Sequence, residues 1–168
     1  MSLRKHFKLA DDIITHLNTV VRSIPDPFIG SRYTGLVSIA AVTVYELCIK
    51  EIFCEFSQKK DKAFGIFVEN YFKRISGRIK YQIICEDYLK KFGDKYYKKF
   101  KERSNSAEEI CLRDYGNSIF NSYNNIIEWR NQFAHEGTIP TTATYEEVTK
   151  SYEIGKNIVI ILKEIMKV

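Results

Sequence analysis

The sequence has 168 residues, of which 28% are charged and 45% hydrophobic, with 8 Gly and 3 Pro. This composition is typical of one globular domain and excludes a disordered, collagen-like or disulfide-rich chain. The net charge of +5 is unevenly distributed, because residues 71–103 hold 11 of the 26 basic residues and only 4 of the 21 acidic ones.

No membrane span or signal peptide is expected. The longest uncharged runs, such as residues 33–45, are too short to cross a bilayer, and Asp11 and Asp12 interrupt the N-terminal stretch. The cysteines lack zinc-ligand spacing and are expected to be small buried side chains in a reducing cytosol. They are Cys48, Cys54, Cys85 and Cys111. The sequence therefore predicts a single soluble, cytoplasmic domain over residues 1–168.

Apolar residues recur every three or four positions through most of the chain, which indicates helices. A first helix is expected to end before Pro25, and its apolar stripe consists of Leu3, Phe7, Ala10, Ile14, Leu17 and Val21. A second, very apolar helix is predicted from Arg32 to Phe56 as the most buried element. Its inward residues are expected to be Leu36, Ile39, Ala40, Val44, Leu47, Cys48 and Ile52.

A third helix and a basic fourth helix are predicted in the middle of the chain. Asp61 is placed to cap the third helix, which continues to about Ile75, and Ser76-Gly77 marks its end or a kink. The fourth helix is predicted over residues 86–102, with Gly93 as a weak point within it.

Two later pairs have the spacing of a capping box. Ser106 and Glu109 predict a short helical turn up to Gly116, and Thr144 and Glu147 open a last helix. The inward stripe of that helix is Val148, Tyr152, Gly155, Val159, Leu162 and Met166. Because no strand alternation competes with these patterns, the predicted fold is one all-α bundle of five to six helices.

The basic segment, residues 71–103, also contains eight aromatic residues interleaved with its Lys and Arg side chains. This pattern suits a polyanion whose bases can stack, such as RNA. It equally fits a helix whose aromatic face is core and whose lysines form a solvated face.

The fifth helix, predicted over residues 117–136, contains a polar interruption. Its inward stripe begins with Ile119, Tyr123 and Ile126. The next position of this stripe is Arg130, and Asn131 breaks the neighbouring apolar line in the same turn. Because burying an unpaired guanidinium is costly, Arg130 must pair with a carboxylate or face a groove, an interface or an anionic ligand. Glu46 and Glu51 on the second helix are possible partners.

His135 lies in the last turn of the same helix. It follows Asn131 by four residues, so these two side chains can converge on one face. Arg130 lies about 140° away on an ideal helix, so it is expected to flank a site with His135 rather than touch it. Gly137 is a C-terminal cap residue, and the helix dipole at this end favours a protonated imidazole. His135 is therefore placed either to exchange protons near neutral pH or simply to cap the helix.

Residues 129–135, with the sequence WRNQFAH, resemble the signature of HEPN domains. This signature is an Arg, usually followed by a polar residue such as Asn, and a His four to six positions after the Arg. Residues 33–37 leading into 45–47, residues 75–80 and residues 133–141 look like the RiboL-PSP-HEPN branch of the family. The resemblance covers almost the whole chain and implies a HEPN-like all-α bundle with the signature on a late helix.

The resemblance implies a metal-independent endoribonuclease that acts as a homodimer, without a cofactor. It further implies a toxin or anti-phage effector with an RNA substrate and, in toxin–antitoxin systems, an antitoxin protein. Carried over, Arg130 and His135 are the catalytic pair and Asn131 is the adjacent polar residue. Some HEPN toxins are inactivated by modification of a tyrosine two positions after the His; Gly137 occupies that position here, which argues against this regulation.

Two further expectations follow from the resemblance. Basic side chains of the segment 71–103 are expected to guide single-stranded or tRNA-like RNA towards the site. They are Arg74, Arg78, Lys80, Lys90 and Lys91. The alternative is a catalytically inactive HEPN-like module that binds RNA, a nucleotide or a protein, in which Glu46 satisfies Arg130.

Overall fold

The computed structural model describes residues 3–24, 26–138 and 143–167, and within these ranges it contains helices and no strand. The all-α prediction is confirmed, with seven helical segments in the described residues where five to six were expected. The elements are α1 (Leu3–Ser23), α2 (Pro27–Lys60), α3 (Lys62–Lys73), α4 (Tyr81–Ile83), the π-helix η1 (Ile84–Leu89), α5 (Lys90–Phe92), α6 (Asp94–Tyr115), α7 (Ile119–Glu136) and α8 (Tyr145–Ile165). The elements α4, η1 and α5 follow one another without a break and form one segment.

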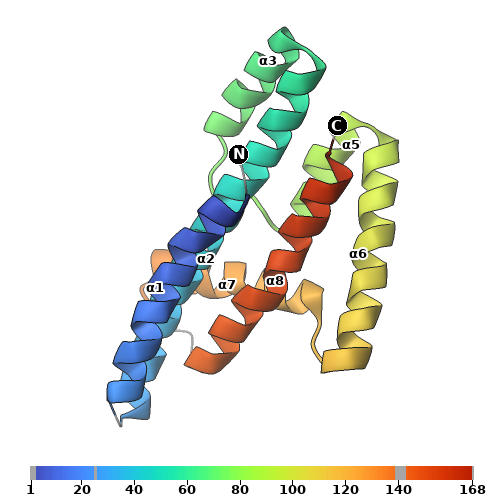
Figure 1. Ribbon diagram of the computed structural model, residues 1–168. Helices are drawn as coiled ribbons and strands as arrows, with labels where there is room; N and C mark the ends of the chain where they lie inside the picture. The colour runs from blue at the N-terminus through green and yellow to red at the C-terminus, as the bar shows by residue number, and fades with distance from the viewer. Residues whose placement is uncertain (1–2, 25, 139–142, 168) are drawn as a thin grey trace.

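The helices pack around the long helix α2 (Figure 1). Helix α1 lies along its N-terminal half, and α3 folds back along its C-terminal half. Helix α7 runs crosswise to α2 and α8 and contacts both, while α6 lies along the other side of α8. In the part of the chain that the structure describes, no helix is long and apolar enough to cross a membrane.

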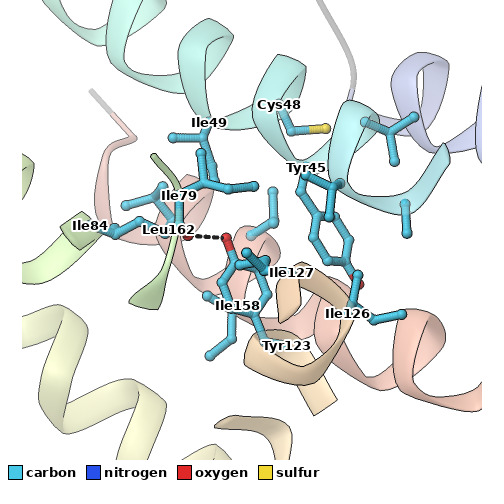
Figure 2. Close-up of a cluster of buried hydrophobic side chains, with 14 of the residues drawn as sticks. Tyr45, Cys48, Ile49, Ile79, Ile84, Tyr123, Ile126, Ile127, Ile158 and Leu162 are labelled. Atoms are coloured by element: carbon cyan, nitrogen blue, oxygen red, sulfur yellow. Dashed lines mark hydrogen bonds between the residues drawn. The ribbon is translucent and has the colours of Figure 1, made fainter. Parts of the chain in front are cut away.

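Three buried tyrosines join α2, α7 and α8 at the centre of the core. The ring of Tyr45 stacks on Tyr123 and on Tyr152, with centroid distances of 5.2 and 5.8 Å, and its hydroxyl donates to the carbonyl oxygen of Tyr152 over 2.6 Å. The hydroxyl of Tyr123 donates to the carbonyl oxygen of Ile79 over 2.7 Å (Figure 2). A β-carbon at Gly155 would come 2.6 Å from the Tyr45 hydroxyl, so glycine permits α8 to approach this closely. These contacts fix the position of α7, the helix that carries Arg130 and His135.

Most of the predicted helix signals are confirmed. All six residues of the expected stripe on α8 are buried, as are the four central residues of the stripe on α1. Asp61 caps α3 by accepting the N–H of Phe64. Thr144 and Glu147 form a reciprocal capping box at the start of α8.

Helix α2 differs from its prediction at both ends and on one face. It begins at Pro27 instead of Arg32, because proline at the first helical position costs no hydrogen bond, and it continues beyond Phe56 to Lys60. Leu36 and Leu47, expected inside, are 43% and 38% exposed. A single helix therefore presents apolar side chains both to the core and to the surface.

The helix predicted over residues 86–102 is helical on both sides of Gly93, but it is not one continuous helix. Gly93 has a φ of 122°, which a side chain would disfavour, and it separates the segment ending at Phe92 from α6. The predicted capping box at Ser106 is wrong as well, since Ser106 lies inside α6 and its hydroxyl donates to the carbonyl oxygen of Glu102. Helix α6 continues to Gly116, where a φ of 64° ends it.

Candidate functional site

Helix α7 carries Arg130, Asn131 and His135 in its last two turns. It begins after Ser118, whose side chain caps the first turn, and it ends at Gly137 in the left-handed conformation with a φ of 65°. The glycine cap and the last-turn position of His135 are therefore confirmed. His135 is exposed, whereas Arg130 and Asn131 are half-buried.

The side chains of Arg130 and His135 are in contact. Nη1 of Arg130 lies 3.3 Å from Nε2 of His135, so the prediction that they would flank a site without touching is wrong. The long arginine side chain crosses the angle that separates the two positions on the helix. Because a guanidinium can only donate, this hydrogen bond requires an unprotonated Nε2 with the ring proton on Nδ1. In this form the lone pair of Nε2 faces Arg130, so His135 can take a proton only when the guanidinium turns to another acceptor, such as a phosphate.

No carboxylate forms an ion pair with Arg130 among residues 3–24, 26–138 and 143–167, so neither of the possible partners, Glu46 and Glu51, is paired with it in this structure. One oxygen of Glu46 accepts from Nζ of Lys50 and the other accepts from the N–H of Gly77, both over 2.7 Å. Glu51 is engaged by a histidine of α1. The positive charge of Arg130 therefore remains available to an anionic ligand.

Gly77 closes one side of the Arg130 site. Its φ of 69° is a conformation that favours glycine, and a β-carbon at this position would come 2.6 Å from Nη2 of Arg130. Glu46 holds the amide of the same residue, so it acts on Arg130 indirectly by fixing the segment against which the guanidinium packs. The sequence marked Ser76-Gly77 only as the end of a helix, because no local pattern reveals a contact with a distant helix.

Glu46→Ala is expected to lower the free energy of unfolding by about 1–3 kcal/mol, because the half-buried amide of Gly77 loses its charged acceptor. Glu46→Gln retains an oxygen for this amide and should cost less. Urea denaturation measures the loss, and hydrogen exchange of the Gly77 amide locates it. Lys50→Met is the matched control, since it removes the other partner of the same carboxylate. Equal losses in the alanine variant and in this control would contradict the anchoring role of Glu46.

A pocket of about 330 Å³ opens beside Arg130, between α2, Ser76 and Ala134 of α7. Two of its lining residues, Ile39 and Thr43, also line an apolar groove of about 500 Å³ between α1 and α2. The exposed side chains at this groove include Leu9, Ile13 and Leu36. An apolar surface is thus continuous with the pocket that holds the guanidinium.

Close packing of α2 against α7 fixes the turn that contains Arg130 and Asn131. A β-carbon at Gly35 would come 2.2 Å from the ring of Phe133, so glycine is needed for this ring to pack on α2. The structure records no hydrogen bond between Asn131 and His135, both of which it describes. Their convergence, expected from the spacing, stays a prediction.

The basic residues expected to guide RNA are exposed, and most of them have partners. Arg78 forms an ion pair with Asp87, Lys80 with Glu128 and Lys90 with Glu86. Nζ of Lys91 donates to the hydroxyl of Tyr71, whereas Arg74 ends α3. Ion pairs at the surface are weak, so these side chains can exchange a carboxylate for a phosphate. Their role in RNA binding stays a prediction.

The aromatic side chains of the basic segment, residues 71–103, mostly belong to the core. Phe72, Tyr88 and Phe100 are buried, and four others pack against the core: Tyr81, Phe92, Tyr96 and Tyr97. Among the eight, only Tyr71 is exposed. The core interpretation of these residues is confirmed, and they offer little ring surface on which RNA bases could stack.

Two of the four cysteines are buried apolar side chains, as expected, and the other two are partly exposed. Cys48 and Cys85 are buried, and burial raises the pKa of their thiols to about 12 and about 11. Cys54 and Cys111 are half-buried. Over the described ranges, no group of three or more His, Cys, Asp or Glu side chains is arranged to hold a metal ion.

Comparison with known protein families identifies the family of this chain. The family model of the RiboL-PSP-HEPN domain matches residues 4–168, nearly the entire chain. Comparison with curated proteins and with solved structures found no match. The matched range includes the Arg130 and His135 pair and every helix that supports it. The chain therefore belongs to the RiboL-PSP-HEPN family.

Proposed function

We propose that this protein is a metal-independent endoribonuclease that cleaves single-stranded or tRNA-like RNA. The observation that carries the proposal is the 3.3 Å contact between Arg130 and His135 at the exposed end of α7. Within the described part of the chain, no ion pair neutralises this guanidinium, which suits it to a phosphate. Membership of the RiboL-PSP-HEPN family supports the same activity.

The proposed reaction uses the 2′-hydroxyl of the RNA itself. His135 takes the proton of this hydroxyl while the 2′-oxygen bonds to phosphorus, and the bond from phosphorus to the 5′-oxygen breaks. The leaving 5′-oxygen takes a proton from an acid. Arg130 stabilises the negative charge that develops on the phosphate oxygens, and Asn131 orients the imidazole or the phosphate. The products are a 2′,3′-cyclic phosphate and a 5′-hydroxyl end.

A homodimer supplies both the base and the acid. One chain places a single histidine beside Arg130, whereas a two-fold axis brings a second His135 to the same cleft. The apolar groove between α1 and α2 runs into the Arg130 pocket, which favours this surface for the second copy. We further propose that the enzyme serves as a toxin or anti-phage effector, held inactive by an antitoxin protein, as the family resemblance implies.

The test is cleavage of single-stranded RNA and tRNA by the purified protein in excess chelator. We expect fragments that end in a 2′,3′-cyclic phosphate, identified by mass spectrometry. If chelator abolished cleavage and Mg²⁺ or Zn²⁺ restored it, the mechanism would be wrong. RNA binding without any cleavage, equal in wild type and His135→Ala, would instead favour the catalytically inactive module.

A further inference from the structure

The segment over residues 76–82, which begins after α3 and ends in the first turn of α4, lies along α7 and connects the Arg130 site to a second pocket. Gly77 packs against Arg130 at one end. Further along, the hydroxyl of Tyr123 on α7 donates to the carbonyl oxygen of Ile79, as Figure 2 shows. At the other end, the N–H of Tyr81 donates to the side-chain oxygen of Asn124 over 3.3 Å. The contact between this segment and α7 therefore lies next to both the Arg130 pocket and the second pocket.

The second pocket has a volume of about 370 Å³ and a polar lining. Its residues are Lys80, Tyr81, Gln82, Asn124, Asn125 and Glu128. Three of these six are carboxamides, which offer both donors and acceptors. The structure records no partner for the amides of Gln82 and Asn125 within the ranges it describes, and both side chains are exposed. Asn124 has used its oxygen on Tyr81, so its NH₂ group remains to donate.

This pocket lies on the side of α7 that carries His135. Asn124, Glu128, Asn131 and His135 follow one another at steps of four, three and four residues, which keeps them within about 60° on an ideal helix. Glu128 and His135 are two turns apart, about 10 Å along the helix axis. A single strand whose phosphate lies at His135 can therefore reach the pocket with a neighbouring nucleotide.

The charges in the pocket favour a base over a phosphate. Nζ of Lys80 lies 3.5 Å from a carboxylate oxygen of Glu128, so the two charges largely balance. Carboxamides match the mixed donor and acceptor edges of unstacked bases. The ionised carboxylate of Glu128 can accept hydrogen bonds but cannot donate them. The exocyclic amino groups of adenine, cytosine and guanine can donate a hydrogen bond to it. Uracil has carbonyl oxygens in those places and offers the carboxylate only its single ring N3–H.

We propose that this pocket binds a nucleobase of the RNA and prefers one with an exocyclic amino group over uracil. The inference rests on the proposed function, because RNA is the ligand. Gln82, Asn125 and Glu128 are then specificity-determining residues, whereas Arg130 and His135 act on the phosphate. Loss of one hydrogen bond to the charged carboxylate corresponds to roughly a tenfold or larger discrimination against uracil.

The test measures binding of short oligo(A), oligo(C) and oligo(U) to the His135→Ala protein, which leaves the strands intact. NMR titration follows the side-chain amide signals of Gln82 and Asn125. We expect oligo(A) or oligo(C) to bind at least about tenfold more tightly than oligo(U) and to shift these signals. Glu128→Gln and Asn125→Ala should remove the preference. Asn121→Ala, which removes an exposed amide of α7 outside the pocket, should retain it.

Equal affinity for all three strands, no detectable binding, or a preference that survives both pocket variants would overturn the assignment. Wild-type cleavage of the same strands is measured alongside. Cleavage without base preference leaves the ribonuclease proposal standing and rejects the pocket. Base-selective binding without any cleavage by the wild type rejects the ribonuclease proposal and retains the pocket.

Discussion

His135→Ala is expected to reduce the rate of RNA cleavage by about 10²–10⁴-fold, the range that general acid–base catalysis contributes. In the proposed homodimer the substitution removes both the base and the acid, so the loss should lie towards the upper end of that range. His135 is exposed and does not belong to the hydrophobic core. Its replacement should therefore leave the fold and its stability nearly unchanged. Initial rates on a fluorescent single strand in excess chelator measure the effect.

The planar shape of the Arg130 guanidinium should matter for the cleavage rate as much as its positive charge. Arg130→Lys keeps a positive charge but loses the planar pair of donors, so we expect a loss of about 10²–10³-fold, as for removal of one transition-state donor. His16→Ala is the matched control for the histidine, because His16 is exposed on α1. Wild-type rates in His135→Ala, or equal losses in the His16 control, would contradict the assignment of the catalytic pair.

Helices with one uninterrupted apolar stripe could be predicted from the sequence with little error. The stripe of α8 and its capping box depend on contacts three and four residues apart, which the sequence displays directly. The bounds of helix α6 were wrong because its residues are mostly polar and few are buried, so no stripe marked its length. Only the positive φ angles of Gly93 and Gly116 set the ends of α6. The spacing of Ser106 and Glu109, which predicted a capping box, lies inside this helix and marks no helix start.

The candidate site shows the same limit at the level of side chains. The polar interruption at Arg130 and the helix-terminal His135 could be read from the periodicity of α7. Their 3.3 Å contact could not be predicted in this way. The helical periodicity gives only the directions of the Cβ atoms, and the guanidinium of Arg130 lies far beyond the Cβ atom of this residue. The partner of Glu46 was also unpredictable, since a backbone N–H in a loop leaves no mark in the sequence.

Leu36→Glu is expected to convert a dimer into a monomer of 19.7 kDa and to abolish cleavage. Leu36 is 43% exposed in the groove between α1 and α2, and in an isologous interface each copy would bury it. An unsatisfied polar group costs about 1–3 kcal/mol on burial and a carboxylate at least as much, so the two substitutions in one dimer should weaken association by at least about 2–6 kcal/mol. Sedimentation equilibrium measures the mass, and RNA cleavage is assayed at the same protein concentrations.

The control must change an equally exposed apolar side chain elsewhere. Ile66 on α3 is 53% exposed and lies outside the groove, so Ile66→Glu should leave both the mass and the cleavage rate unchanged. A wild-type protein that is monomeric while it cleaves RNA would contradict the need for a second copy. A dimer that survives Leu36→Glu but dissociates in Ile66→Glu would place the interface on α3. In that case the apolar groove would not bring the second His135 to the Arg130 pocket, and the acid would have to come from elsewhere in the chain.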